Sequence, residues 1–213
     1  MLISYSLLFF GKLSILHYFC LLHSSRFDRK PNMIKAFQTL YTFLKNPLQG
    51  WSLLKQQTTQ DSVVSIYIIM VFAGLCTAIG NYMELILWKW SDNIIAFLGT
   101  SISLLASLYI ALFLVKLYYE KTEKQLLSNS ICIHFVAFAS VGVYLTFALV
   151  ELTHISLFWL FSLYTIKLVL ESIQSGYIAV EEKRKHTFIW VCSAILILAP
   201  IITYRIIGSI IHL

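Results

Sequence analysis

The chain of 213 residues carries too few charged side chains to cover a soluble globule of its size. Hydrophobic residues make up 59% of the sequence and charged residues 12%, and the mean hydropathy is +0.79, whereas soluble domains carry about 25% charged residues. We therefore expect an all-α integral membrane protein, because a segment that spans a membrane must satisfy its backbone hydrogen bonds internally. The formal net charge of +6 is explained by lipid headgroups and membrane topology, so no nucleic-acid partner is expected.

The first region, residues 1–32, is an apolar extension. Residues 1–22 resemble a further hydrophobic segment, interrupted by Lys12. A secretory signal is a poor explanation, because no basic residue precedes the apolar run and no small-residue cleavage site follows it. Two interpretations stay open: a sixth span that would place the N-terminus outside, or an over-extended gene start with Met33 as the true initiator.

Residues 33–61 are predicted to form a cytoplasmic amphipathic segment containing short interfacial helices. In "MIKAFQTLYTFLK" the apolar residues recur at helical spacing, which suits a helix lying in the headgroup plane. These residues are Ile34, Phe37, Leu40, Tyr41 and Leu44.

A second short helix is predicted to follow at once. Asn46 is a good N-cap and Pro47 is tolerated at the first helical position. Leu48, Trp51 and Leu54 then form an apolar stripe, and Trp51 is expected at the membrane interface because its apolar ring carries a polar N–H. This segment is either an anchor for the first span or a docking surface for a cytoplasmic partner.

Residues 62–213 are predicted to form a membrane domain of five helices. Each apolar run has about 20 residues or more, enough to cross a hydrocarbon core of about 30 Å at 1.5 Å per residue. The predicted spans are Val63–Met83, Ile94–Tyr118, Ile131–Val150, Ile155–Ile178 and Phe188–Ile211.

Basic residues are distributed unequally between the two sides of these spans. Twelve belong to one side: Arg26, Arg29, Lys30, Lys35, Lys45, Lys55, Lys116, Lys121, Lys124, Lys183, Arg184 and Lys185. Only Lys89 and Arg205 belong to the other side. The positive-inside rule then places the segment before the first span in the cytoplasm and the C-terminus outside. In a bacterium the membrane would be the cytoplasmic membrane.

Lys167 and Glu171 form the most informative pair inside a predicted span. They are four residues apart and so share one helix face, and each costs about 2.5–3.5 kcal/mol at the bilayer centre when unpaired. Three roles stay open: a salt bridge that stabilises the bundle, part of a proton or ion pathway, or a contact with a partner helix.

The sequence offers no catalytic, cofactor or metal motif. Neither a phosphate-binding glycine loop nor a nucleophile motif occurs, and the single Glu151-x-x-His154 pair is too little for a di-iron site. Glu151 and Arg205 both fall near the outer membrane boundary, a depth that would suit a contact between them. Small residues four apart in the first two spans predict close helix packing. These residues are Gly74, Ala78, Gly99 and Ser103.

From Met33 onward the layout resembles the YIP (Ypt-interacting protein) domain family in its bacterial form. The resemblance is carried by Asn46, Pro47 and Trp51, by "YIIMVFAGLCTAIGNY", by "LFWLFSLYTIKLVL" with Tyr164, and by "VEEKRKHTFIWVCSAILILAPIITYRII". The chain departs from the family pattern by lacking a proline near "ASVGVY" and by carrying Glu171 where a glycine is expected. It also lacks the D-L-Y-G-P-like motif of eukaryotic relatives, so their Rab-type GTPase partner is not carried over.

The resemblance implies a non-enzymatic scaffold or adaptor in membrane organisation or recruitment. Its cytoplasmic face would combine residues 33–57 with the basic loop of Lys183, Arg184 and Lys185. The expected partners are anionic lipid headgroups and an unidentified membrane or cytoplasmic protein. The alternative is a small transporter or proton- or ion-coupled channel that uses Lys167 and Glu171.

Overall fold

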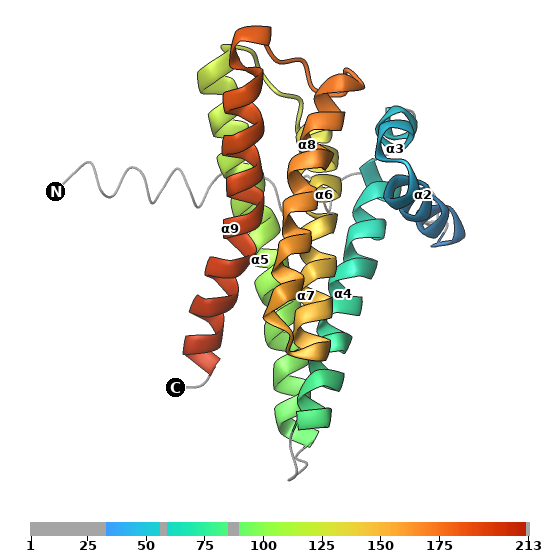
Figure 1. The fold of residues 1–213 in the computed structure, drawn as a ribbon, viewed down its shortest axis with the longest axis vertical. Coiled ribbons are helices and arrows are strands. Elements are labelled where there is room, and N and C mark those ends of the chain that lie inside the picture. Colours follow the sequence, from blue (N-terminus) through green and yellow to red (C-terminus); the bar gives the residue numbers. More distant parts are fainter. Residues whose placement is uncertain (1–32, 56–58, 85–89, 212–213) are drawn as a thin grey trace, which may run out of the picture. The chain divides into compact units, whose positions relative to one another are not determined.

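A computed structural model describes residues 33–55, 59–84 and 90–211, and every regular element within these ranges is a helix (Figure 1). Residues 1–32, for which the sequence predicts an apolar extension, lie outside the described residues. The elements are α2 (Met33–Lys45), α3 (Pro47–Leu54), α4 (Thr59–Glu84), α5 (Trp90–Glu123), α6 (Asn129–Ala139), α7 (Val141–Thr153), the 3₁₀ helix η1 (Ser156–Leu163), α8 (Tyr164–Gln174), the 3₁₀ turn η2 (Glu182–Arg184) and α9 (Lys185–Ile211).

Five of the described segments are long and apolar enough to cross a membrane, which confirms the predicted number of such helices. They are Val64–Met83, Asn93–Glu123, Asn129–Thr153, Ser156–Gln174 and Glu182–Ile210. Consecutive segments run in opposite directions along the bundle (Figure 1). One end of the bundle therefore carries the loops at residues 124–128 and 175–184, and we call it the basic end.

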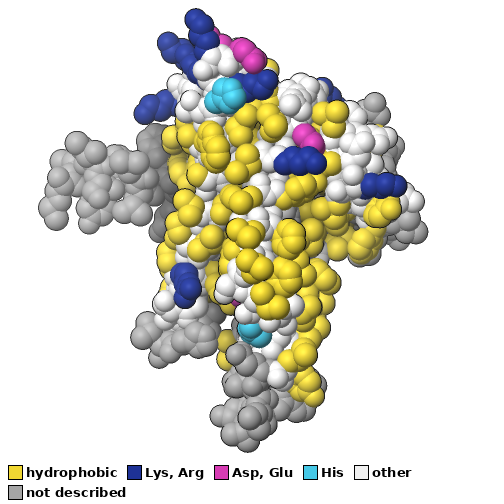
Figure 2. Space-filling view, viewed as in Figure 1, with side chains coloured by type: hydrophobic (Ala, Val, Ile, Leu, Met, Phe, Trp, Pro, Cys, Tyr) yellow, Lys and Arg dark blue, Asp and Glu magenta, His cyan; other side chains and the backbone are white. Residues whose placement is uncertain are grey.

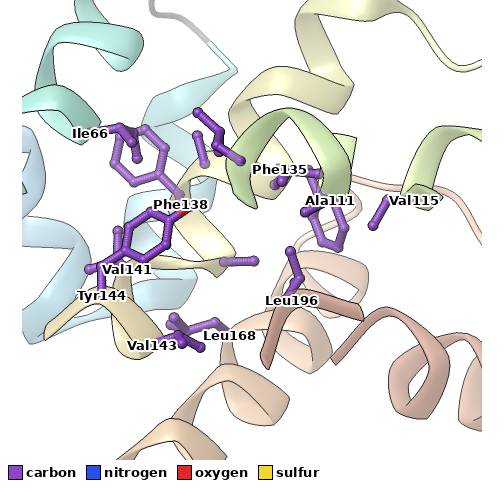
Figure 3. Close-up of a cluster of buried hydrophobic side chains, with 14 of the residues drawn as sticks. Ile66, Ala111, Val115, Phe135, Phe138, Val141, Val143, Tyr144, Leu168 and Leu196 are labelled. Carbon is purple, nitrogen blue, oxygen red and sulfur yellow. The ribbon is translucent and has the colours of Figure 1, made fainter. Parts of the chain in front are cut away.

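The third segment, α6 followed by α7, forms the centre of the bundle. It is the most buried of the five candidate spans, with 78% of its apolar window buried against 28% for the fourth. Figure 3 shows that α4, α5, α8 and α9 each contribute side chains to the same cluster, among them Ile66, Val115, Leu168 and Leu196. These side chains surround aromatic residues of α6 and α7, so the core is continuous across the bundle.

Close helix packing around α4 depends on glycine. A Cβ at Gly74 would collide with the Ser101 hydroxyl of α5, and a Cβ at Gly80 would collide with the Glu151 carbonyl of α7. The prediction of close packing by small residues is therefore confirmed at Gly74. The same feature at Gly80 was not singled out from the sequence.

Helices α2 and α3 together form a compact pair that we call the elbow. The Asn46 side chain accepts a hydrogen bond from the Gln49 backbone N–H at 3.4 Å, and Pro47 occupies the first turn, so the predicted cap is confirmed. A Cβ at Gly50 would lie 2.6 Å from Cδ2 and 2.8 Å from Cα of Phe43. Because one of these atoms is backbone, only glycine lets α2 and α3 approach this closely.

Two spans differ in detail from the continuous helices that the sequence predicts. The third is interrupted at Ser140, between α6 and α7. The fourth begins as the 3₁₀ helix η1 and ends at Gln174 rather than Ile178. The early end has a local cause: Gly176 adopts a φ of +64°, and the helix is closed by two capping hydrogen bonds, from the Gly176 N–H to the Ile173 carbonyl and from the Tyr177 N–H to the Ser172 carbonyl.

Candidate functional site

Trp51 attaches the elbow to the membrane-type helices. Its side chain is fully buried, and its indole N–H donates a hydrogen bond to the Leu168 carbonyl of α8 at 3.1 Å. The ring contacts Phe43 of α2, Phe135 of α6 and Tyr177 of the α8–α9 loop, with centroid separations of 5.0, 6.0 and 5.0 Å. The ring and the N–H are therefore both satisfied inside the protein, so Trp51 does not need the membrane interface to satisfy its polar N–H.

The α8–α9 loop at residues 175–181 connects the elbow to two further helices. The Lys55 ammonium donates to the Ser175 carbonyl at 3.0 Å, and the Tyr119 hydroxyl of α5 donates to the Ala179 carbonyl at 2.8 Å. The Tyr177 hydroxyl lies 2.9 Å from Nδ1 of His134 in α6. Burial raises the pKa of the Tyr177 hydroxyl, so it stays protonated and able to hydrogen-bond.

Lys167 and Glu171 form an ion pair on the flank of α8. Lys167 Nζ lies 3.8 Å from Glu171 Oε1, and the two side chains are 56% and 15% exposed. The ammonium also lies 5.6 Å from the centroid of the Tyr164 ring, within the range of a cation–π contact. Glu171 Oε2 is buried and has no hydrogen-bond partner among the described residues. The lysine side chain of the pair is therefore exposed, whereas the glutamate side chain is largely buried.

The predicted basic loop contains residues with different structural roles. Arg184 donates to the Thr122 carbonyl at the end of α5, and its Nε lies 3.6 Å from Glu181 Oε2. Lys185 Nζ lies 3.4 Å from Glu182 Oε1. Lys183 is exposed. Arg184 therefore fixes the loop to α5, while Lys183 is presented to the surroundings.

The opposite end of the bundle carries a polar contact that differs from the expected one. Glu151 Oε2 accepts a hydrogen bond from the Tyr204 hydroxyl at 3.1 Å, linking α7 to α9, while Arg205 is exposed. Within the described residues, no group of three or more His, Cys, Asp and Glu side chains is placed to hold a metal ion.

The remaining family-motif position, Tyr164, lies where η1 becomes α8. Its ring atom Cδ1 would lie 3.5 Å from a Cβ at Gly142, and Thr165 Oγ1 would lie 3.3 Å from it. Gly142 thus lets α7 and the start of α8 pack closely. Tyr164 is partly buried against the core, so its position serves packing and the contact with Lys167.

Several residues of this site were missed by sequence reasoning. Phe43, His134 and Tyr177 lie in three separate segments, and their proximity depends on contacts between distant parts of the chain. Gly50 gave a usable signal, because an isolated glycine inside a short apolar helix suggests a close backbone contact. The aromatic residues gave none, since phenylalanine and tyrosine are abundant throughout the sequence.

Figure 2 shows the character of the molecular surface around these residues. Hydrophobic side chains cover most of the visible face, and Lys and Arg side chains gather at the basic end. A scan against protein-family models, a search of curated proteins and a search of solved structures find no match to this chain.

Proposed function

We propose that this protein is a five-span membrane scaffold of the YIP type, without enzymatic activity. It would hold its basic end in the cytoplasm and present that end to anionic lipid headgroups and to a membrane or cytoplasmic protein. The observation that carries the proposal is the organisation of the basic end. Lys55 at the end of α3, Tyr119 of α5 and His134 of α6 contact the α8–α9 loop, and Arg184 at the end of the following turn η2 bonds to the Thr122 carbonyl of α5.

This organisation suits recognition because the loop is held in place before any partner binds. Glu181 N–H adds a further contact by donating to Glu123 Oε2 at 3.2 Å. A preorganised surface loses less conformational entropy on binding than a mobile loop does. Lys183 supplies positive charge to that surface, together with the exposed Lys121 in the last turn of α5 and Lys124 directly after α5.

Two structural features support the YIP resemblance as part of the proposal. The helix break at Ser140 falls in the stretch "ASVGVY", where the family pattern has a proline. A proline also disturbs a helix, although at Ser140 the hydrogen bonds from the Ser140 N–H to Val136 and from the Tyr144 N–H to Ser140 are both kept at 3.0 Å. Asn46 and Pro47, which carry part of the resemblance, form the start of α3.

The second candidate function is proton or ion transport through the Lys167–Glu171 pair. The observation that favours it is Glu171 Oε2, which is buried without a hydrogen-bond partner among the described residues. An ionisable side chain inside a candidate membrane span is by default a candidate for a transport pathway. Against this role stands the exposure of Lys167, which places the pair at the side of α8 rather than within an enclosed passage.

The two functions are separated by flux measurements on the full chain in proteoliposomes. The scaffold proposal predicts that wild type and the Lys167→Met, Glu171→Gln double variant both carry proton and cation flux no higher than protein-free vesicles. Protease protection would show that both proteins are inserted equally. Flux in the wild type that the double variant loses would establish transport and overturn the scaffold proposal.

A further inference from the structure

The elbow contacts the candidate spans at three depths. The Lys55 ammonium meets the carbonyl of Ser175, directly after α8 ends. The Trp51 N–H meets Leu168, six residues before that end, which corresponds to about 9 Å along an α-helix. The Phe43 ring packs 5.0 Å from the ring of Phe138, nine residues into the third span, or about 14 Å from its start.

The length of the fourth span relates these distances along the helices to depth in a bilayer. Its eight 3₁₀ residues and eleven α-helical residues extend over about 32 Å at 2.0 and 1.5 Å per residue. That length matches a hydrocarbon core of about 30 Å, so the end of α8 lies near the edge of the core when the span is inserted. Trp51 then lies about 9 Å inside that edge. The 25 residues of the third span extend over about 38 Å, about 8 Å more than the core, so Phe138 and the Phe43 ring against it lie about 10 Å inside the core.

The outer surface of the elbow is compatible with lipid. Phe37, Tyr41, Leu48 and Leu53 are 53%, 67%, 47% and 36% exposed although the opposite face of each helix is packed on the bundle. Apolar side chains therefore occur on both faces of the elbow, which differs from a helix that has one face in water. Lys45 is the exposed charged side chain at the end of α2, and its ammonium lies 6.0 Å from the centroid of the Tyr41 ring. Its long aliphatic stem lets the ammonium extend toward the headgroups.

Two hydroxyl groups of the elbow are already satisfied within their own helices. Thr42 Oγ1 donates to the Gln38 carbonyl at 2.9 Å, and Ser52 Oγ donates to the Gln49 carbonyl at 2.7 Å. Such bonds remove the need for water, because the donor no longer has to be solvated. The hydroxyls therefore do not prevent contact between the elbow and acyl chains.

We propose that the elbow is embedded in a single leaflet, with its outer face in contact with the acyl chains of the lipids. It would occupy that leaflet only at the basic end, so the protein would displace more lipid there than in the opposite leaflet. This inference rests on the proposed insertion of the five spans. It replaces the predicted position in the headgroup plane, because the contacts with Leu168 and Phe138 lie too deep for that position.

Cysteine labelling of the full chain in lipid vesicles tests the depth. A charged, membrane-impermeant maleimide reacts with thiolates, and mass spectrometry of each peptide separates an introduced cysteine from the native ones. Leu126→Cys in the α5–α6 connection is the water-exposed control, and Leu198→Cys in α9 is the lipid-facing control; the native side chains are 90% and 51% exposed. We expect Leu48→Cys to react about tenfold or more slowly than Leu126→Cys, because an apolar environment suppresses the thiolate.

The controls separate failure of this inference from failure of the five-span proposal. If Leu198→Cys is protected but Leu48→Cys reacts as fast as Leu126→Cys, the elbow is not embedded, although the spans are. If Leu198→Cys also reacts fast, the five-span proposal itself fails. Photoreactive p-benzoylphenylalanine at position 48 identifies the occupant: an adduct with the mass of one lipid is expected, and a cross-linked dimer would overturn acyl-chain contact.

Discussion

Trp51 illustrates how one side chain can determine the position of two helices. Its N–H is bonded to a carbonyl 117 residues away, and its ring contacts aromatic residues of three other segments. The sequence correctly predicted the cap and the helix that present Trp51. It did not predict where the ring points, because Leu48, Trp51 and Leu54 form a single stripe by spacing, whereas Leu48 is exposed and the other two are buried. That distinction depends on the long-range contact with Leu168.

Substitutions of Trp51 should separate the contribution of its volume from that of its hydrogen bond. Trp51→Ala is expected to lower the free energy of unfolding by about 3–5 kcal/mol, since it leaves a cavity in a packed core. Trp51→Phe retains an aromatic ring and should cost about 1–2 kcal/mol, mainly through loss of the N–H bond. Unfolding in mixed micelles, titrated with a denaturing detergent, measures both changes.

The matched control for this series is Tyr41→Ala on the exposed face of the same elbow. Tyr41 is 67% exposed, so its truncation should change the unfolding free energy in micelles by less than about 0.5 kcal/mol. Equal effects of Trp51→Ala and Tyr41→Ala would contradict the assignment of Trp51 as the residue that attaches the elbow.

The ends of the helices were harder to predict than the helices themselves. The fourth apolar run continues through Tyr177 and Ile178, so hydropathy alone extended the helix to Ile178. The structure ends it at Gln174 because Gly176 takes a left-handed conformation and the Gly176 and Tyr177 N–H groups cap the carbonyls of Ile173 and Ser172. The sequence contained this signal, since glycine after a run of helical residues is a common helix terminator. Tyr177 and Ile178, which follow this glycine, are buried side chains of the α8–α9 loop. Hydropathy does not distinguish buried loop residues from residues of a membrane span.

Gly176→Ala should loosen the α8–α9 loop through backbone strain alone. The nearest atom to an added Cβ is Lys55 Nζ at 3.8 Å, so there is no collision. A left-handed conformation costs an L-residue about 1–2 kcal/mol, which corresponds to about a fivefold to thirtyfold rise in amide exchange of the loop if exchange proceeds through local opening. Hydrogen exchange of residues 175–181 in nanodiscs measures this rise.

Two further variants show whether conformation is responsible. Gly176→Asn should give a smaller rise, because asparagine tolerates the left-handed region better than alanine does. Gly208→Ala introduces a Cβ in a helix with no atom within 4 Å and should leave the loop unchanged. A loop in Gly176→Ala that exchanges at the wild-type rate would contradict the role given to Gly176.

At the scale of the molecule, composition predicted the architecture well. The preference of side chains for an apolar or an aqueous solvent determines which segments become long apolar helices. The five apolar runs all appear as helical segments long and apolar enough to cross a membrane. The position of the elbow stays a prediction, because an amphipathic sequence is equally compatible with a headgroup plane and with a protein surface inside the leaflet. The contacts of Trp51 with Leu168 and of Phe43 with Phe138 are the observations on which the proposed position within one leaflet rests.

The charge distribution makes a prediction about the orientation of the whole protein. Lys183 and the α5–α6 connection that contains Leu126 lie at the basic end, while α9 runs from there to the opposite end (Figure 1). The bias of basic residues toward one side therefore predicts that this end faces the cytoplasm and that the end of α9 faces outward.

Site-specific labelling of three positions in intact cells tests this topology most directly. Cysteines introduced as Leu126→Cys, as Lys183→Cys and in a short tag after Leu213 are treated with an impermeant maleimide before and after permeabilisation. We predict that the tag is labelled in intact cells and that positions 126 and 183 are labelled only after permeabilisation. Labelling of position 183 and the tag from the same side, or the reverse pattern, would contradict an inserted α9 with the basic end in the cytoplasm.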